Sequence, residues 1–195
     1  MKNIEAKIEE AFRETFLLPR EMTITGFLAD VLSSKYKFRE DDRKIEVISV
    51  YYYAQSPVSI LFALPNYEYY SPDKTAYMDE LNLKEHGFED YTYTDVQELC
   101  KKVLDENHVH YETYLDENDL PDLSHFLESQ SGIEISFLST YWKKAKEQVH
   151  SKTLGFLESS DGAGGIYDLD NSYQLPFEIE LDEYLRSHGF NFEKE

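Results

Sequence analysis

The segment IEVISVYYYAQSPVSILFAL, residues 45–64, carries the clearest fold signal in the chain. Two runs rich in β-branched and aromatic residues, 45–54 and 56–64, are separated by a short turn signal around Gln55–Pro57. This pattern predicts a β-hairpin. Because both runs are apolar on both faces, we expect the hairpin to lie centrally in a sheet that helices cover.

The sequence on either side of the hairpin predicts helices. Apolar residues recur at helical spacing from Ile4 to Phe12, which predicts a helix over residues 2–16. Helix-capping hydroxyl residues stand at Ser71 and at Thr94, the latter three residues before Gln97 in a predicted capping box. Further helices are predicted at 24–34, at 118–131 with Gly132 as its stop, at 140–150 and at 181–188.

Short runs with strand character complete the predicted elements. These runs are HVHYETYL at 108–115, IEISFL at 133–138, TLGFLES at 153–159, IYDLD at 166–170 and YQLPFEI at 173–179. The last three predict a C-terminal meander. Because helices and strands interleave irregularly, the predicted fold class is α+β, with a mixed or mainly antiparallel sheet, a central hairpin and about six helices. We predict a single α+β domain over residues 1–195.

Two similar hexapeptides, LKEHGF at 83–88 and LRSHGF at 185–190, are predicted to end helices in the same way. A left-handed Gly87 would place Leu83 and Phe88 at the two positions that touch in a Schellman motif. The second hexapeptide repeats this arrangement. Two helix ends therefore explain the similarity without a repeated domain.

The stretch SSDGAGGIYDLDNS, residues 159–172, combines glycines with carboxylates at Asp161, Asp168 and Asp170. A phosphate-binding loop needs a lysine after its last glycine, and a calcium loop needs glycine and glutamate where Tyr173 and Ile179 stand. We therefore expect the glycines to form a corner between two strands. An irregular cation-binding loop is the alternative.

Charge is the main guide to function. The chain holds 39 acidic and 19 basic residues, a formal net charge of -20. Because nucleic acid and anionic membranes would repel it and basic proteins would attract it, we predict a basic protein partner, no direct nucleic-acid binding and no membrane binding. The alternative is that the charge only keeps the protein in solution. A start without signal-peptide character and the lack of a long apolar run predict a cytoplasmic protein.

His108, His110 and Glu112 are the best metal-binding candidates. On a strand, alternation would place all three side chains on one face, with successive ones about 6–7 Å apart along the backbone. Two imidazoles and a carboxylate there could bind zinc or iron with an open position. That face could equally be the solvent-exposed side of the strand. A metal-dependent enzyme is therefore an alternative function; otherwise no cofactor is expected.

Acidic runs that also contain aromatic residues favour a binding function, because carboxylates attract over distance and aromatic rings supply contact area. The sequence contains no nucleophile motif, and Cys100 lies in an apolar helical stripe. We predict a non-catalytic acidic protein, an inhibitor or immunity-type protein that neutralises a basic partner, for example one directed at nucleic acid. A structural or assembly subunit is a further alternative. The predicted partner-binding residues are Glu40, Asp41, Asp42, Asp116, Glu117, Asp119, Asp122, Asp182 and Glu183.

The segment GGIYDLDNSYQLPFEIELDEYL, residues 164–185, resembles the strand–strand–helix ending of a family of bacterial immunity proteins. The resemblance covers about a tenth of the chain and implies no role for an individual residue. It agrees with the binding function that the charge predicts.

Overall fold

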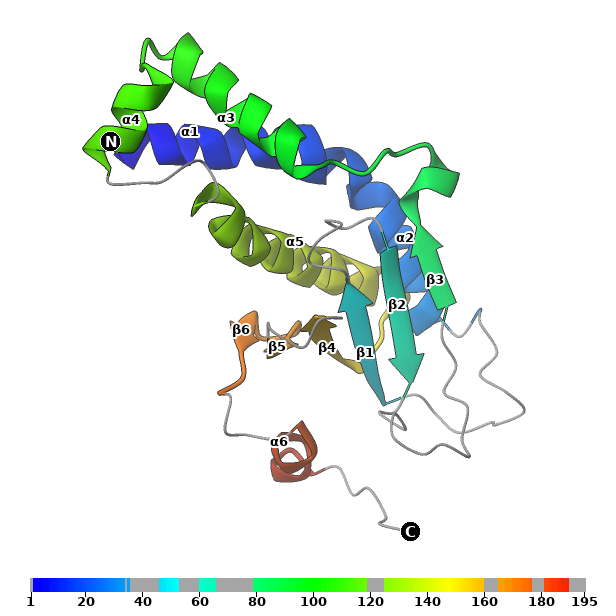
Figure 1. Cartoon of the computed structure of the whole chain (residues 1–195). Helices are drawn as coiled ribbons and strands as arrows, with labels where there is room; N and C mark the ends of the chain where they lie inside the picture. Colours follow the sequence, from blue (N-terminus) through cyan, green and yellow to red (C-terminus); the bar gives the residue numbers. More distant parts are fainter. Residues whose placement is uncertain are drawn as a thin grey trace.

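The computed structural model describes residues 2–33, 35, 46–52, 60–65, 79–118, 125–159, 165–176 and 181–189 (Figure 1). Within them the α-helices are α1 (Lys2–Phe12), α2 (Glu21–Leu32), α3 (Tyr93–Glu106), α4 (Tyr111–Glu117), α5 (His125–Val149) and α6 (Leu181–Ser187). The strands are β1 (Val47–Tyr52), β2 (Ile60–Pro65), β3 (Asp79–Asn82), β4 (Leu154–Ser159), β5 (Ile166–Asp168) and β6 (Tyr173–Gln174). A π-helical turn, η1 (Arg13–Leu17), and the 3-10 helices η2 (Leu18–Arg20) and η3 (Leu83–His86) connect some of these elements.

The strands form one mixed sheet in the order β3-β2-β1-β4-β5-β6. β1 pairs antiparallel with β2 and parallel with β4, and the other neighbouring strands pair antiparallel. The predicted hairpin and C-terminal meander are therefore confirmed, and β1 lies inside the sheet as expected. The expected turn at Gln55–Pro57 lies outside the described residues. The fold class is α+β, as predicted.

Helices lie on both faces of the sheet (Figure 1). α2 and α5 pack against each other on one face, where strand alternation buries Ile48, Val50 and Leu157. The opposite alternation turns Val47 and Phe156 to the other face, where they pack with Leu185 of α6. Burial on both faces explains why the central strands are apolar throughout.

Three helices form an extension beside the sheet, called here the helical arm (α1, α3 and α4; Figure 1). α1 lies against α3, and their contact contains the buried residues Phe12, Val96, Cys100 and Leu104. Burial raises the pKa of the Cys100 thiol to about 11, so the thiol stays protonated near neutral pH. Cys100 is therefore a core residue, as its position in an apolar stripe predicts.

Two of the predicted strands are wrong, because the segments are helical. Residues 108–115 form a turn followed by α4, and residues 133–138 lie inside α5. The first segment also places Tyr111, Tyr114 and Leu115 at helical spacing, so the short run fits both periods and tertiary packing decides between them. α5 also joins the separately predicted helices 118–131 and 140–150, and Gly132 does not end it.

The N-cap of α3 is Thr92, two residues before the predicted cap. The Thr92 Oγ1 accepts a hydrogen bond from the Asp95 amide at 3.3 Å, and the Asp95 carboxylate accepts one from the Thr92 amide at 2.6 Å. This capping box replaces the one predicted at Thr94 and Gln97, which is wrong. The helix start expected at Ser71 lies outside the described residues.

The predicted Schellman ending after Leu83 is confirmed. Gly87 has a φ of +84°, and the Phe88 amide donates to the Leu83 carbonyl at 3.0 Å. The helix that ends there is only the short η3. After α6, Gly189 is also left-handed, with a φ of +88°. Among the described residues, no helix is both long enough and apolar enough to pass through a membrane.

Candidate functional site: an acidic tip and three polar clusters

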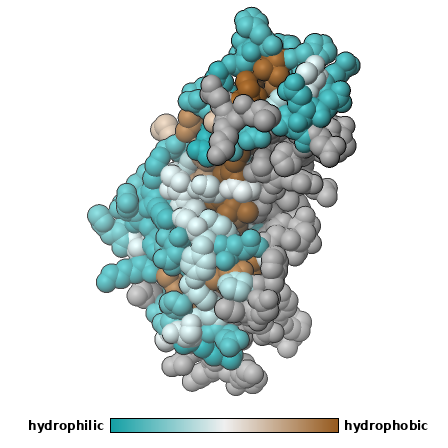
Figure 2. All heavy atoms as spheres, turned by 90° about the vertical axis from the view of Figure 1, so that its left-hand side faces the viewer, coloured by the Kyte–Doolittle hydropathy of each residue, from teal (hydrophilic) through white to brown (hydrophobic). Residues whose placement is uncertain are grey.

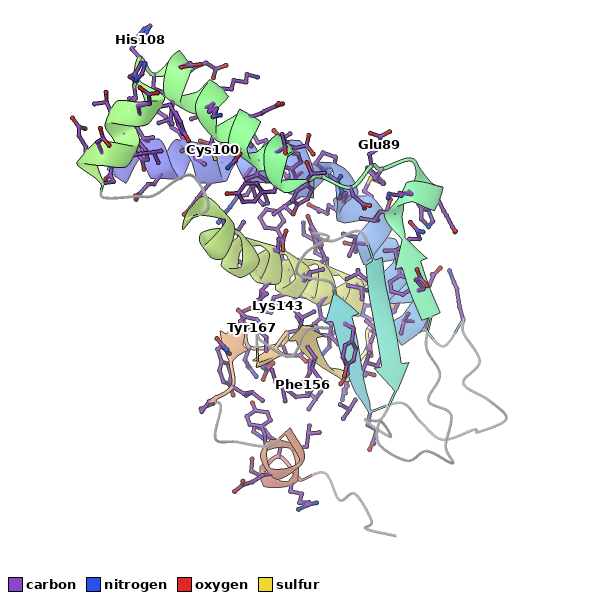
Figure 3. All side chains as sticks on the ribbon, in the orientation of Figure 1. Glu89, Cys100, His108, Lys143, Phe156 and Tyr167 are labelled. Carbon is purple, nitrogen blue, oxygen red and sulfur yellow. The ribbon has the colours of Figure 1, made fainter. Side chains whose placement is uncertain are left out.

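The predicted metal site does not have the geometry that its prediction requires. His108 lies in the turn after α3 with a φ of +58°, His110 precedes α4, and Glu112 lies in the first turn of α4. The side chains therefore do not alternate along a strand, and all three residues are exposed. His108 stands at the far end of the helical arm (Figure 3). No group of three or more His, Cys, Asp or Glu suited to a metal ion occurs within the described part of the chain.

The predicted partner-binding residues fall in separate places. Asp116 and Glu117 are exposed neighbours at the end of α4. Glu183 is exposed on α6, and Asp182 belongs to the same helix. The structure brings only Asp116 and Glu117 together. The remaining predicted residues lie outside the described part of the chain: Glu40, Asp41, Asp42, Asp119 and Asp122.

The far end of the helical arm carries exposed carboxylates contributed by α3 and α4. We call these residues the acidic tip: Asp105, Glu106, Glu112, Asp116 and Glu117. Of these, Asp116 and Glu117 are predicted from the sequence. Glu112 is predicted as a metal ligand. Asp105 and Glu106 escape prediction because most of the turn at 107–110, which brings α4 next to the end of α3, is expected from the sequence to be part of a strand.

Basic residues near the acidic tip neutralise it only weakly. Lys102 approaches Glu106 at 3.9 Å, which is the one ion pair that the tip makes among the described residues. Lys7 donates to Asn107 instead of a carboxylate, and Lys101 lies 4.9 Å from the centre of the Tyr111 ring. Most carboxylates of the tip therefore have no basic side chain beside them among the described residues, and they are available to a cationic group of a partner.

Figure 2 views the molecule from the side on which the arm ends. The upper part of this face, which belongs to the arm, shows hydrophilic side chains on both sides of a hydrophobic strip.

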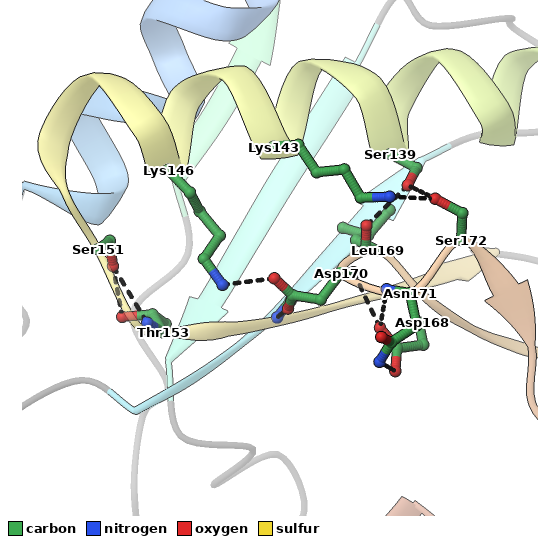
Figure 4. Close-up of polar contacts among 11 residues, drawn as sticks. Ser139, Lys143, Lys146, Ser151, Thr153, Asp168, Leu169, Asp170, Asn171 and Ser172 are labelled. Atoms are coloured by element: carbon green, nitrogen blue, oxygen red, sulfur yellow. Dashed lines mark hydrogen bonds and ion pairs between the residues drawn. The ribbon is translucent and has the colours of Figure 1, made fainter.

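The carboxylates of the glycine-rich stretch have a structural role. Buried Asp168 accepts hydrogen bonds from the amides of Asp170 and Asn171 at 2.8 and 2.9 Å. Its other oxygen accepts from the Asn171 side chain at 2.8 Å and from the Tyr184 hydroxyl at 3.0 Å. Asp170 in turn binds Lys146 of α5 (Figure 4). Both carboxylates are occupied in the turn between β5 and β6. Of the predicted glycine corner between β4 and β5 only Gly165 is described, with a φ of +68°, and Asp161 lies outside the described residues.

A buried polar cluster on the α6 side of the sheet escapes prediction from the sequence. The Tyr51 hydroxyl donates to Glu158 Oε2 at 2.9 Å, whereas Glu158 Oε1 and the Ser49 hydroxyl are buried and have no hydrogen-bond partner among the described residues. Desolvation raises the pKa of Glu158, and nearby Ser49 opposes the increase in part although its geometry falls short of a hydrogen bond. In the sequence, this cluster is signalled only by Ser49 in the apolar strand β1 and by Glu158 in the apolar strand β4.

We expect Glu158→Gln to remove part of the pH dependence of stability. Because the folded state holds the Glu158 proton to a higher pH than the unfolded state, the wild type loses stability as pH rises through the pKa of the folded state. The variant should lose less stability than the wild type as pH rises above about 4.5, and it should be the more stable of the two at neutral pH by on the order of 1 kcal/mol. Urea unfolding at several pH values measures this difference. The exposed Glu85→Gln is the control, and parallel wild-type and Glu158→Gln curves would contradict the expectation.

A shallow open depression of about 520 Å³ lies at the base of the helical arm. Its lining includes Arg20, Glu89, Asp90, Asp95 and Glu98. Arg20 is buried, whereas Glu89 and Glu98 are exposed. Sequence reasoning does not single out these residues, because nothing in the sequence around Arg20 shows that this arginine is buried.

Comparison with protein-family models, with curated proteins and with solved structures found no match for the chain.

Proposed function

We propose that the protein is a non-catalytic binding protein that docks its acidic tip onto a basic surface of a protein partner, as an inhibitor or an immunity-type protein does. One observation carries the proposal: residues 103–142 contain nine carboxylates and no lysine or arginine. The five residues of the acidic tip are those of the nine carboxylates that the structure describes as exposed.

The structural setting of the tip supports a binding role. α3, which carries Asp105 and Glu106, is held by its capping box and by packing on α1. α4, which carries the other three carboxylates, is held by its buried residues Tyr114 and Leu115. Both helices therefore present the carboxylates from packed elements. A preorganised charged surface steers a partner of opposite charge at little cost in ordering entropy. The partner class that fits is a protein with a basic surface, such as one directed at nucleic acid.

Neutralising the tip should weaken binding to a basic probe more than neutralising acids elsewhere. The variant is Glu112→Gln/Asp116→Asn/Glu117→Gln, and the probe is a fluorescein-labelled lysine-rich peptide. Since each exposed charge contributes about 0.5 kcal/mol, we expect about tenfold weaker binding at low salt. Fluorescence anisotropy gives the dissociation constants, and the difference should shrink as NaCl rises from about 50 to about 300 mM.

The matched control changes net charge equally at exposed positions outside the tip and outside the predicted partner-binding residues: Glu14→Gln/Glu85→Gln/Glu147→Gln. We expect the affinity of the control variant for the peptide to fall about twofold or less. Equal losses in both variants would show that only overall charge matters and would refute a localised site.

A further inference from the structure

Arg20 is a buried cation that has no carboxylate partner among the described residues. Only 7% of the residue is exposed. Its Nη1 donates to the Phe16 carbonyl, and its Nη2 donates to the Glu89 carbonyl at 2.5 Å. The guanidinium carbon lies 5.5 Å from the centre of the Phe88 ring and 5.6 Å from that of Tyr91. Carbonyls and aromatic faces therefore hold this charge, and no ion pair from the described part of the chain neutralises it.

A buried charge without a counter-ion is costly. The desolvation of Arg20 lowers its pKa, and Asp90 and Tyr91 offset this only in part. Asp90 itself binds Lys84 at 2.6 Å. A guanidinium has five N–H donors, and the described protein groups use two of those on Arg20. The remaining donors can bind an anionic group that enters the depression, which Arg20 lines.

The local backbone is also unusual. Phe16, whose carbonyl Arg20 binds, belongs to the π-helical turn η1, and Thr15 and Phe16 of that turn line the depression. Such turns are rare and often lie at functional sites. The turn and the buried arginine thus meet at one depression in the surface.

The rim of the depression is mainly acidic. Besides Arg20, its lining contains four acidic residues and one lysine, Lys102, which lies 3.9 Å from Glu106. Glu98 is exposed on α3 and makes no side-chain hydrogen bond or ion pair within the described residues. The same holds for exposed Glu89, which lies in the connection between β3 and α3 (Figure 3). Asp95 adds a third carboxylate. The rim would repel a simple anion such as phosphate, and Arg20 would repel a simple cation. The lining also contains the apolar residues Phe16 and Leu99.

We propose that this depression binds a small molecule or chain end that carries a carboxylate and, beyond a short apolar segment, an ammonium or guanidinium group. The carboxylate accepts hydrogen bonds from Arg20, and the cation lies among Glu89, Asp95 and Glu98. The proposal is independent of the function proposed for the acidic tip.

The test compares three probes of similar length: 6-aminohexanoate, hexanoate and hexylammonium. Amide chemical shifts of α3, followed by two-dimensional NMR, report binding to the depression. We expect 6-aminohexanoate to bind about tenfold more tightly than either singly charged probe. Glu98→Gln should weaken 6-aminohexanoate about threefold and leave hexanoate no weaker. The exposed Glu85→Gln should change nothing.

Arg20→Lys keeps the charge but removes the planar fork of donors, and it should weaken both carboxylate probes. If this variant does not fold, Glu98→Gln still decides the question. Equal binding of 6-aminohexanoate and hexanoate, or no effect of Glu98→Gln, would overturn the proposal. The triple acidic-tip variant should bind 6-aminohexanoate as tightly as the wild type does. The proposal for the depression and the proposal for the acidic tip can therefore fail independently of each other.

Discussion

Replacing Gly155 by alanine is expected to lower the free energy of unfolding by about 3 kcal/mol. A Cβ at this position would lie 2.2 Å from Cε2 and 2.3 Å from Cζ2 of Trp142. The Trp142 side chain is fully buried in the contact between α5 and the sheet, so it cannot move away without repacking the core. Gly155 is needed because it lets β4 approach the indole.

Thermal and urea unfolding, followed by the fluorescence of the single tryptophan, measure this effect at the point of strain. The matched control is Gly132→Ala within α5, where an added Cβ meets nothing within 4 Å. Because glycine is unfavourable inside a helix, the control should gain about 0.5–1 kcal/mol. The same glycine-to-alanine substitution should thus lower the free energy of unfolding at position 155 and raise it at position 132. Wild-type stability of Gly155→Ala would show that the indole does not lie against β4 as described.

Asp168→Ala is expected to have the second largest effect, also on the order of 3 kcal/mol. The substitution would leave the amides of Asp170 and Asn171 without their acceptor and would release the Tyr184 hydroxyl from its partner. Because Tyr184 belongs to α6, the helix should loosen as well as the turn. Hydrogen exchange should therefore speed up at the two amides and in α6.

Asp168→Asn separates hydrogen bonding from charge at the same position. An asparagine keeps one acceptor oxygen, so it should cost less than alanine. Glu183→Ala on the exposed side of α6 is the control and should stay within about 0.5 kcal/mol of the wild type. A similarly small change for Asp168→Ala would mean that the turn does not depend on this carboxylate.

Much of the sheet could be predicted because its central strands are β-branched and apolar on both faces, which excludes most other structures for residues 45–64. The segments at 108–115 and 133–138 are short, and their apolar residues fit both the helical and the strand period. The packing of the helical arm and of α5 therefore decides that they are helical. The cap of α3 shows a finer ambiguity. Thr92 and Thr94 both stand three residues before a polar acceptor, and the sequence does not distinguish them.

The candidate sites were harder to predict because they depend on which distant residues meet. Asp116 and Glu117 could be named from a local acidic run, whereas Asp105 joins them only through a turn that the sequence presents as a strand. Arg20 could not be named at all. An arginine is usually exposed, and its burial here results from contacts with residues some 70 positions away, including a hydrogen bond to Glu89.

The parallel pairing of β1 with β4 has a consequence for protein synthesis. This pairing joins the two antiparallel halves of the sheet. The paired residues are far apart in the sequence: Tyr51 and Glu158, for example, are separated by 107 positions. On the ribosome, the first half must wait with the edge of β1 unpaired until β4 has been translated. The nascent chain is therefore most exposed to aggregation during the interval in which α3, α4 and α5 are being made.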